Sequence, residues 1–163
     1  MLMDIQLKDN WNIWCHYEKD NWKISGFKNI YTIKTPKDFW KLYNNWNKIG
    51  GIITKHLFIM KEGVMPIWED PKNINGGCWS FKITEENAEE FWEDLSIYLV
   101  TNNICKNISD EIVGLSICLK KNNNVVIKIW NTNSTNNSLK LINEDILKKW
   151  GIDIIYIAHI PEQ

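Results

Sequence analysis

The sequence predicts an α+β fold in which three amphipathic helices cover an open antiparallel sheet. Three segments repeat apolar residues every three or four positions, which indicates helices that bury one face. Seven short runs, rich in β-branched and aromatic residues, instead have a period of two, which indicates strands. The chain has 163 residues, of which 44% are hydrophobic, so we expect a single domain over 1–163 with one core.

Start and stop signals place the helices. The predicted helices span about 36–48, 84–99 and 138–150. In the first, Thr35 can cap the helix, and Pro36 suits the first turn because proline has no N–H to leave unpaired. The second follows Thr84 with two glutamates, which the helix dipole favours at that end. The third begins at Ser138 and has a basic last turn before Gly151, a residue typical of helix ends.

The strands and one hairpin follow from the period of two. The runs cover about 10–15, 28–34, 56–61, 78–83, 112–121, 125–131 and 153–159. Three asparagines, at 122–124, join the fifth and sixth runs as a tight hairpin, because asparagine tolerates the left-handed backbone that such turns require. We expect the resulting sheet to be antiparallel and open.

The two strands of this hairpin have one apolar face and one mixed face. The apolar face, expected against the helices, carries Leu115, Ile117, Leu119, Val125, Ile127 and Ile129. The opposite face carries Ser116, Cys118, Lys120, Val126, Lys128 and Trp130. A half-solvated face with two lysines and a large aromatic ring is suited to form the floor of a ligand site.

Composition and cysteine spacing exclude several classes of protein. Nineteen lysines, no arginine and 20 acids give a net charge of −1, which excludes a polybasic nucleic-acid coat. No apolar run reaches the roughly 18 residues of a membrane span, and no secretory leader is present, so we expect no membrane partner and a reducing, cytoplasmic location. The four cysteines lack zinc spacing, and the glutamates at 85–90 suit a solvated helix face, so neither metal nor cofactor is expected.

No catalytic motif stands out. His16, His56 and His159 have no nucleophile motif around them. The chain also lacks the G-x-S-x-G, H-E-x-x-H, Walker and dinucleotide-binding patterns. We therefore expect a binding protein rather than an enzyme.

The segment MPIWEDPKNINGGCW, at 65–79, combines an aromatic residue, two acids and a Gly-Gly turn. Trp68 has two interpretations there: it folds back onto the core, or it stacks on a flat ligand. Its neighbour Glu69 favours the second, because a carboxylate can accept two hydrogen bonds from the edge of a guanine. A guanine methylated at N7 is cationic, and stacking between two indoles then gains roughly 0.5–2 kcal/mol per face.

With these motifs in order, the chain resembles the cap-binding translation initiation factor 4E family over almost its whole length. The resemblance is carried by Trp11-x-x-Trp14, Trp22, Phe39-Trp40-x-Leu42-Tyr43, Met65-Pro66-x-Trp68-Glu69-Asp70, Gly76-Gly77-x-Trp79, Phe91-Trp92, Ser109-Asp110-x-x-x-Gly114 and Ile129-Trp130. It implies a curved antiparallel sheet of seven or eight strands, with three α-helices on its convex face and a cap pocket on the concave side. Richness in isoleucine, asparagine and lysine is typical of an A+T-rich genome, and a virus-encoded member is one expectation.

The resemblance implies that Trp22 and Trp68 sandwich the 7-methylguanine of the mRNA cap. Glu69 would then bind the guanine edge. For Trp22 the alternative is a core tryptophan at the end of a strand.

The resemblance also implies how the rest of the cap is bound. Trp130 corresponds to the tryptophan that approaches the N7-methyl group, and Lys120 to a basic residue that reaches the cap phosphates. Lys128 and Lys121 are further candidates, and Lys128 is preferred because it shares a strand face with Trp130. Cys78 stands where family members commonly have an arginine, so we expect weaker and more salt-sensitive phosphate contacts.

A second surface is implied on the convex side. Trp40, Asp94 and Ile97 correspond to residues that hold a helix of an initiation scaffold of the factor 4G kind, or of a 4E-binding repressor. Trp40 has an alternative role in packing its own helix. The chain differs from the family at 5–7, where it has Ile-Gln-Leu, and also at Pro36 and Thr101.

Three functions therefore remain open. In the first, the protein binds the 7-methylguanosine cap of mRNA and takes part in translation initiation. In the second, it keeps the pocket but has lost the scaffold, and acts as a cap-sequestering repressor or decoy, in the host cytoplasm if it is viral. The third and least expected is an enzyme acting on caps, for which no acid/base pair can be named.

Overall fold

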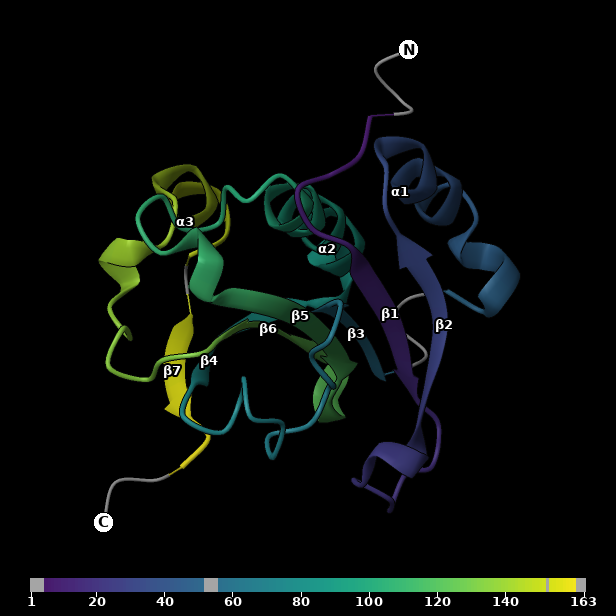
Figure 1. Cartoon of the computed structure of the whole chain (residues 1–163), viewed down its shortest axis with the longest axis horizontal. Coiled ribbons are helices and arrows are strands. Elements are labelled where there is room, and N and C mark those ends of the chain that lie inside the picture. Colours follow the sequence, from purple (N-terminus) through teal and green to yellow (C-terminus); the bar gives the residue numbers. More distant parts are fainter. Residues whose placement is uncertain (1–4, 52–55, 152, 161–163) are drawn as a thin grey trace.

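The seven predicted strands form one sheet, in the order β2-β1-β3-β5-β6-β4-β7, and every neighbouring pair is antiparallel. The computed structural model describes residues 5–51, 56–151 and 153–160. The strands are β1 (Trp11–His16), β2 (Phe27–Ile33), β3 (His56–Lys61), β4 (Gly77–Thr84), β5 (Ile112–Leu119), β6 (Asn124–Asn131) and β7 (Ile154–Ala158). The helices are α1 (Pro36–Tyr43), α2 (Glu85–Val100) and α3 (Glu144–Trp150). Figure 1 shows the three helices along the convex side of the curved sheet, which confirms the predicted fold class.

The first helix begins as predicted but ends earlier. Thr35 Oγ1 accepts a hydrogen bond from the Asp38 N–H, and the Asp38 carboxylate accepts one from the Thr35 N–H, each at 3.1 Å. This reciprocal cap satisfies two backbone donors at the helix start. The predicted end near 48 was wrong, because α1 stops at Tyr43 and a separate 3-10 turn covers 46–49. Two asparagines, Asn44 and Asn45, separate α1 from this 3-10 turn. Asparagine side chains compete with helical backbone hydrogen bonds, so a helix tends to end at such residues.

The third helix starts later than predicted. Ser138 does act as a cap, since its Oγ accepts a hydrogen bond from the Lys140 N–H, but it caps only a 3-10 turn at 139–141. Ile142 is then extended and forms an isolated bridge with Cys105. α3 follows with Asn143 as its own cap. The predicted start at Ser138 was therefore wrong, because a distant strand-like contact interrupts the helical path.

The hairpin between β5 and β6 has the predicted turn and faces. Asn122 and Asn123 have φ angles of 66° and 59°, in the left-handed region. Five of the six predicted inward residues are buried in the core that the sheet shares with the helices: Leu115, Ile117, Val125, Ile127 and Ile129. Leu119 differs, being 39% exposed at the end of β5. Among the described residues, no helix is long and apolar enough to cross a membrane.

The concave face of the sheet carries a second, smaller apolar cluster. Its buried members are Phe27, Phe58, Met60, Val64, Cys78, Val113 and Trp130. Strand register sets the floor of this face, because Phe58 pairs with Ser116, which pairs with Lys128. Two residues along β6 from Lys128, and therefore on the same face, Trp130 pairs with Cys78 on β4. The mixed face predicted from the sequence is thus assembled from at least four adjacent strands.

Candidate functional site

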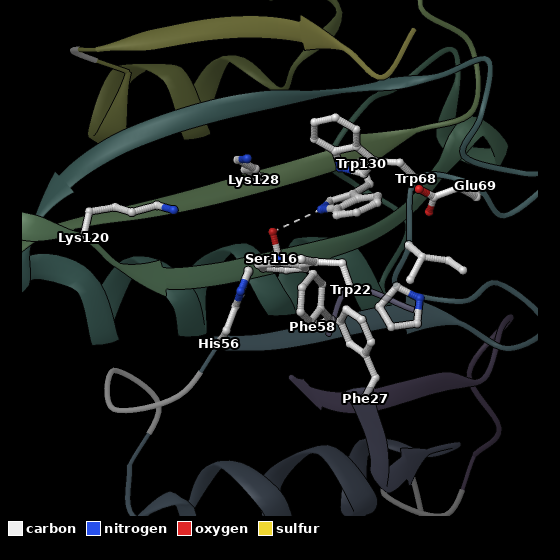
Figure 2. Close-up of a pocket in the computed structure, with 12 residues that line it drawn as sticks. Trp22, Phe27, His56, Phe58, Trp68, Glu69, Ser116, Lys120, Lys128 and Trp130 are labelled. Carbon is white, nitrogen blue, oxygen red and sulfur yellow. Dashed lines mark hydrogen bonds between the residues drawn. The ribbon is translucent and has the colours of Figure 1, made fainter. Parts of the chain in front are cut away.

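A pocket of about 330 Å³ opens on this concave face. It is lined by Trp22, Phe27, His56, Phe58, Pro66, Ile67, Trp68, Glu69, Ser116, Lys120, Lys128 and Trp130. In Figure 2, Trp68, Trp130 and Glu69 lie on one side of the pocket and Lys120 on the other. The pocket therefore combines flat aromatic surfaces and one carboxylate with two lysines, an arrangement suited to a planar base that carries an anionic group.

Trp22 lies on the loop between β1 and β2 and is 57% exposed. Its ring stacks on that of His16, with centroids 4.0 Å apart and an interplanar angle of 24°. The loop returns tightly to β2 at Gly26, where a Cβ atom would lie 2.1 Å from the Asn21 carbonyl oxygen. Only glycine fits there. The interpretation of Trp22 as a core residue does not agree with its exposure.

Trp68 lies on the loop after β3 and is 47% exposed, which also disagrees with the core interpretation. The loop is held from within by Asp70, whose carboxylate accepts hydrogen bonds from the Met65 and Lys72 N–H groups, both at 2.8 Å. The fully buried Asn73 donates from its amide to the Met65 and Ile67 carbonyls, at 2.9 and 2.8 Å. Two buried polar side chains thus replace the regular structure that this loop lacks.

The ring of His159 lies against Trp68, with centroids 5.2 Å apart and an interplanar angle of 17°. Its Nδ1 donates to the Asn73 carbonyl at 2.7 Å, since a carbonyl can only accept. In the neutral ring Nε2 is then the acceptor, and the Cys78 thiol donates to it at 3.3 Å. Burial raises the pKa of the Cys78 thiol and lowers the pKa of His159, so both groups are neutral at physiological pH.

Trp130 forms part of the pocket floor and is only 3% exposed. Its indole Nε1 donates to the Ser116 hydroxyl at 3.1 Å, so the buried N–H is satisfied by a neighbouring strand (Figure 2). Glu69, by contrast, is exposed at the pocket rim. A carboxylate in this position is able to accept hydrogen bonds from a ligand edge.

The predicted cationic residues separate into two groups. Lys120 and Lys128 line the pocket, whereas Lys121 does not, because it begins the turn beyond β5 and is exposed there. Lys128 follows the prediction that it shares a strand face with Trp130. A lysine is a compact, strongly hydrated charge, so these two side chains can attract phosphate without the bidentate geometry of arginine.

Three histidines near the pocket were not predicted as site residues, because no sequence motif surrounds them. His56 lines the pocket and stacks on Phe58 at 4.4 Å, while His16 and His159 lie against the two exposed indoles. One signal was available, since His56 and Phe58 are two positions apart on a predicted strand and must share a face.

The residues predicted to bind a scaffold lie on the convex side. Trp40 on α1 is half-buried and packs edge-on against Phe39, with centroids 5.0 Å apart. Ile97 on α2 is partly buried against the core. The Asp94 carboxylate accepts hydrogen bonds from Lys149 at 2.9 Å and from the Trp150 indole at 3.3 Å. Asp94 therefore joins α2 to α3 within the chain.

The stability of the fold should fall as the solution becomes acidic, in part because of His56. Burial first, and then Lys120, His16 and Lys128, lower the pKa of His56 from 6.5 to about 3. Below pH 6.5, His56 binds a proton in the unfolded chain but not in the folded chain. The free energy of unfolding should therefore decrease by up to about 1.4 kcal/mol per pH unit towards pH 3. Denaturant titrations at pH 7, 6 and 5 would measure this slope, and His56→Phe should show a shallower one. Equal slopes for the unmodified protein and His56→Phe would contradict the lowered pKa of His56.

Comparison with known proteins places the chain in a family. It matches the family model described as Eukaryotic initiation factor 4E over residues 6–159. It is 30% identical over 123 residues to eukaryotic translation initiation factor NCBP of Triticum aestivum, covering 75% of this chain and 52% of that protein. It is 32% identical over 124 residues to eukaryotic translation initiation factor 4E-1 of Hordeum vulgare, covering 74% and 54%. The chain thus spans about half the length of the curated relatives that it matches.

Solved structures show the same fold. A complex of eIF4E-3 of C. elegans with the 4E-binding protein Mextli and a cap analog has a TM-score of 0.80 at 24% identity, and the match covers 94% of this chain and 92% of that one. The eIF4E-3 of Ascaris suum with m7G cap has a TM-score of 0.79 at 22% identity, covering 96% and 92%. The motifs of the sequence, the shared fold and the family match lead to one conclusion: the chain belongs to the eukaryotic initiation factor 4E family.

Proposed function

We propose that this protein binds the 7-methylguanosine cap of mRNA in its concave pocket and acts in translation initiation in the cytoplasm. One observation carries the proposal: the exposed indoles of Trp22 and Trp68 line the same pocket as the Glu69 carboxylate. Exposed aromatic rings that border one pocket, rather than lying singly on the surface, are typical of ligand sites. The cap bound to Ascaris suum eIF4E-3, within the same fold, is a ligand of the right shape.

Each part of the cap has a matching group in the pocket. The two indoles provide faces for the purine ring, and Glu69 can accept hydrogen bonds from the guanine N1–H and 2-amino groups. Lys120 and Lys128 provide positive charge for the phosphates. Methylation at N7 makes the base cationic, and the electron-rich faces of tryptophan favour a cation.

The test is a titration of the purified protein with 7-methyl-GTP and, separately, with GTP. Tryptophan fluorescence should be quenched strongly by the methylated nucleotide, which should bind at least about fivefold more tightly, since a cation–π contribution of roughly 0.5–2 kcal/mol per indole face is lost with GTP. Equal affinities, or no response to either nucleotide, would refute cap recognition. Recovery of the cap analogue unchanged after incubation would support binding without turnover.

We further infer that the convex surface binds a partner of the kind found with relatives, such as the 4E-BP in complex with Schistosome eIF4E. Trp40→Ala should weaken binding of a 4E-BP peptide by at least about tenfold, because tryptophans often dominate the energy of helix-in-groove interfaces. The affinity for 7-methyl-GTP should stay within about twofold, since Trp40 does not line the pocket. Unchanged peptide binding, measured by fluorescence anisotropy, would mean that Trp40 only packs its own helix.

A second function is favoured by the engagement of Asp94. Its carboxylate already accepts hydrogen bonds from Lys149 and Trp150, both at Oδ2, and its ion pair with Lys149 partly neutralises its charge, so a partner would compete with Lys149 for Asp94. A protein that binds caps but no scaffold would sequester mRNA and repress translation. Absence of peptide binding by the unmodified protein, together with tight binding of 7-methyl-GTP, would select this repressor function.

A further inference from the structure

Each exposed indole of the pocket has an imidazole packed against it. His16 stacks on Trp22 with ring centroids 4.0 Å apart, and His159 stacks on Trp68 at 5.2 Å, with interplanar angles of 24° and 17°. The two indoles line the pocket, whereas the two imidazoles do not. The imidazoles therefore contact the indoles from outside the pocket lining. Two further ring contacts lie beside these pairs: Trp22 also meets the edge of His56 at 5.9 Å, and His159 also meets Trp130 at 5.0 Å.

The same two imidazoles also hold the loops that carry the indoles. His16 donates from Nε2 to the carbonyl of Asn21, the residue before Trp22, at 2.8 Å. His159 donates from Nδ1 to the carbonyl of Asn73, in the loop of Trp68, at 2.7 Å. Each histidine has a backbone fixed by the sheet, since His16 belongs to β1 and the His159 N–H follows β7 and bonds to the Gly76 carbonyl at 2.9 Å. Ring stacking and a loop-anchoring hydrogen bond thus come from a single side chain at both sites.

We infer that His16 and His159 are positioning residues that hold the indole rings of Trp22 and Trp68 in fixed orientations before the ligand binds. Each indole ring held in this way is called a plate below, because a ligand base can stack on its flat face. The inference rests on the proposed cap binding and explains how the pocket is formed in advance. A tryptophan on an unsupported loop would populate several rotamers, and ordering it on binding would weaken the affinity by roughly two- to tenfold for each plate. Burial lowers the pKa of His159, so this imidazole is neutral and adds no positive charge behind the indole of Trp68.

Paired substitutions separate the two contacts of each histidine. His16→Phe keeps a stacking ring but removes the donor, while His16→Gln keeps a donor but removes the ring. His159→Phe and His159→Asn do the same at the second plate. Calorimetric titration with 7-methyl-GTP should give a two- to tenfold weaker affinity for each variant. Tyr17→Phe is the matched control, because it removes the hydrogen bond from Tyr17 to the Ser25 carbonyl in the same loop without touching the indole stack. Its affinity should equal that of the unmodified protein.

A double-mutant cycle distinguishes positioning from a general effect on the fold. His16→Leu should lose its effect on affinity in a Trp22→Ala background, because no plate is left to position, and should keep its full effect in a Trp68→Ala background. His159→Leu should show the reverse pattern: it should keep its full effect in the Trp22→Ala background and lose most of it in the Trp68→Ala background, where only its contact with Trp130 is left.

Two results would overturn the inference: histidine variants that bind as tightly as the unmodified protein, or equal effects of a histidine substitution in both alanine backgrounds. If the unmodified protein fails to bind 7-methyl-GTP, the proposed function itself is refuted, and the positioning inference is refuted with it. Binding by the unmodified protein without coupling in the cycle refutes the positioning inference alone.

Discussion

Trp68→Ala is expected to weaken the binding of 7-methyl-GTP by roughly a hundredfold while leaving the fold intact. Stacking of a base on an aromatic ring contributes about 1–3 kcal/mol, and a cationic base adds a further electrostatic attraction to the ring face. Trp68 is 47% exposed and belongs to neither buried apolar cluster, so its removal should leave both clusters intact. Calorimetric titration gives the affinity without relying on tryptophan fluorescence, and a thermal melt reports the stability of the same sample.

Two matched variants sharpen this prediction. Trp68→Phe keeps a flat ring with a weaker negative face, so it should reduce the preference for 7-methyl-GTP over GTP more than it reduces the affinity for GTP. Trp40→Ala removes an indole from the opposite side of the sheet and should not change nucleotide affinity. If Trp68→Ala binds 7-methyl-GTP as tightly as the unmodified protein, the indole is not a ligand plate, and the proposed cap site is wrong.

Local sequence signals predicted the boundaries of helices and turns well where the residues that fix a boundary lie close together in the chain. Thr35 and Pro36 identified the start of α1 because the capping residue and the first helical residue are neighbours in the chain. The asparagine turn before β6 was equally local. The start of α3 was missed because Ile142 pairs with Cys105, 37 positions earlier in the chain, and no local spacing reveals that contact.

The candidate site divides in the same way. Strand periodicity alone placed Lys128 and Trp130 on one face, and both line the pocket. Trp68 and Glu69 could be predicted as site residues because no helical or strand period explains a tryptophan beside a carboxylate in a loop. The support of Trp68 by His159 depends on a sheet that brings His159 to a loop 86 positions away at Asn73, so only the folded chain shows it.

Asp70→Asn should affect both stability and ligand binding, although Asp70 does not line the pocket. The side chain is 7% exposed, and its two carboxylate oxygens accept hydrogen bonds from the Met65 and Lys72 N–H groups, on either side of Trp68 and Glu69. An asparagine of the same shape can accept only one of these bonds and turns its amide N–H₂ towards the other donor. A hydrogen bond to a charged group contributes about 1.5–3 kcal/mol, so the loss of one such bond should lower the free energy of unfolding by about that amount.

The affinity of Asp70→Asn for 7-methyl-GTP should fall by more than about tenfold, because misplacing the loop by even about 1 Å separates the plate and the carboxylate from the base. Denaturant unfolding and calorimetric titration measure the two effects. Glu62→Gln is the matched control, since it removes one negative charge from an exposed position at the start of the same loop and should change neither quantity. Loss of affinity with unchanged stability would show that the charge of Asp70 acts on the ligand directly. Loss of both, with Glu62→Gln unaffected, would show that the buried carboxylate acts by holding Trp68 and Glu69 in place.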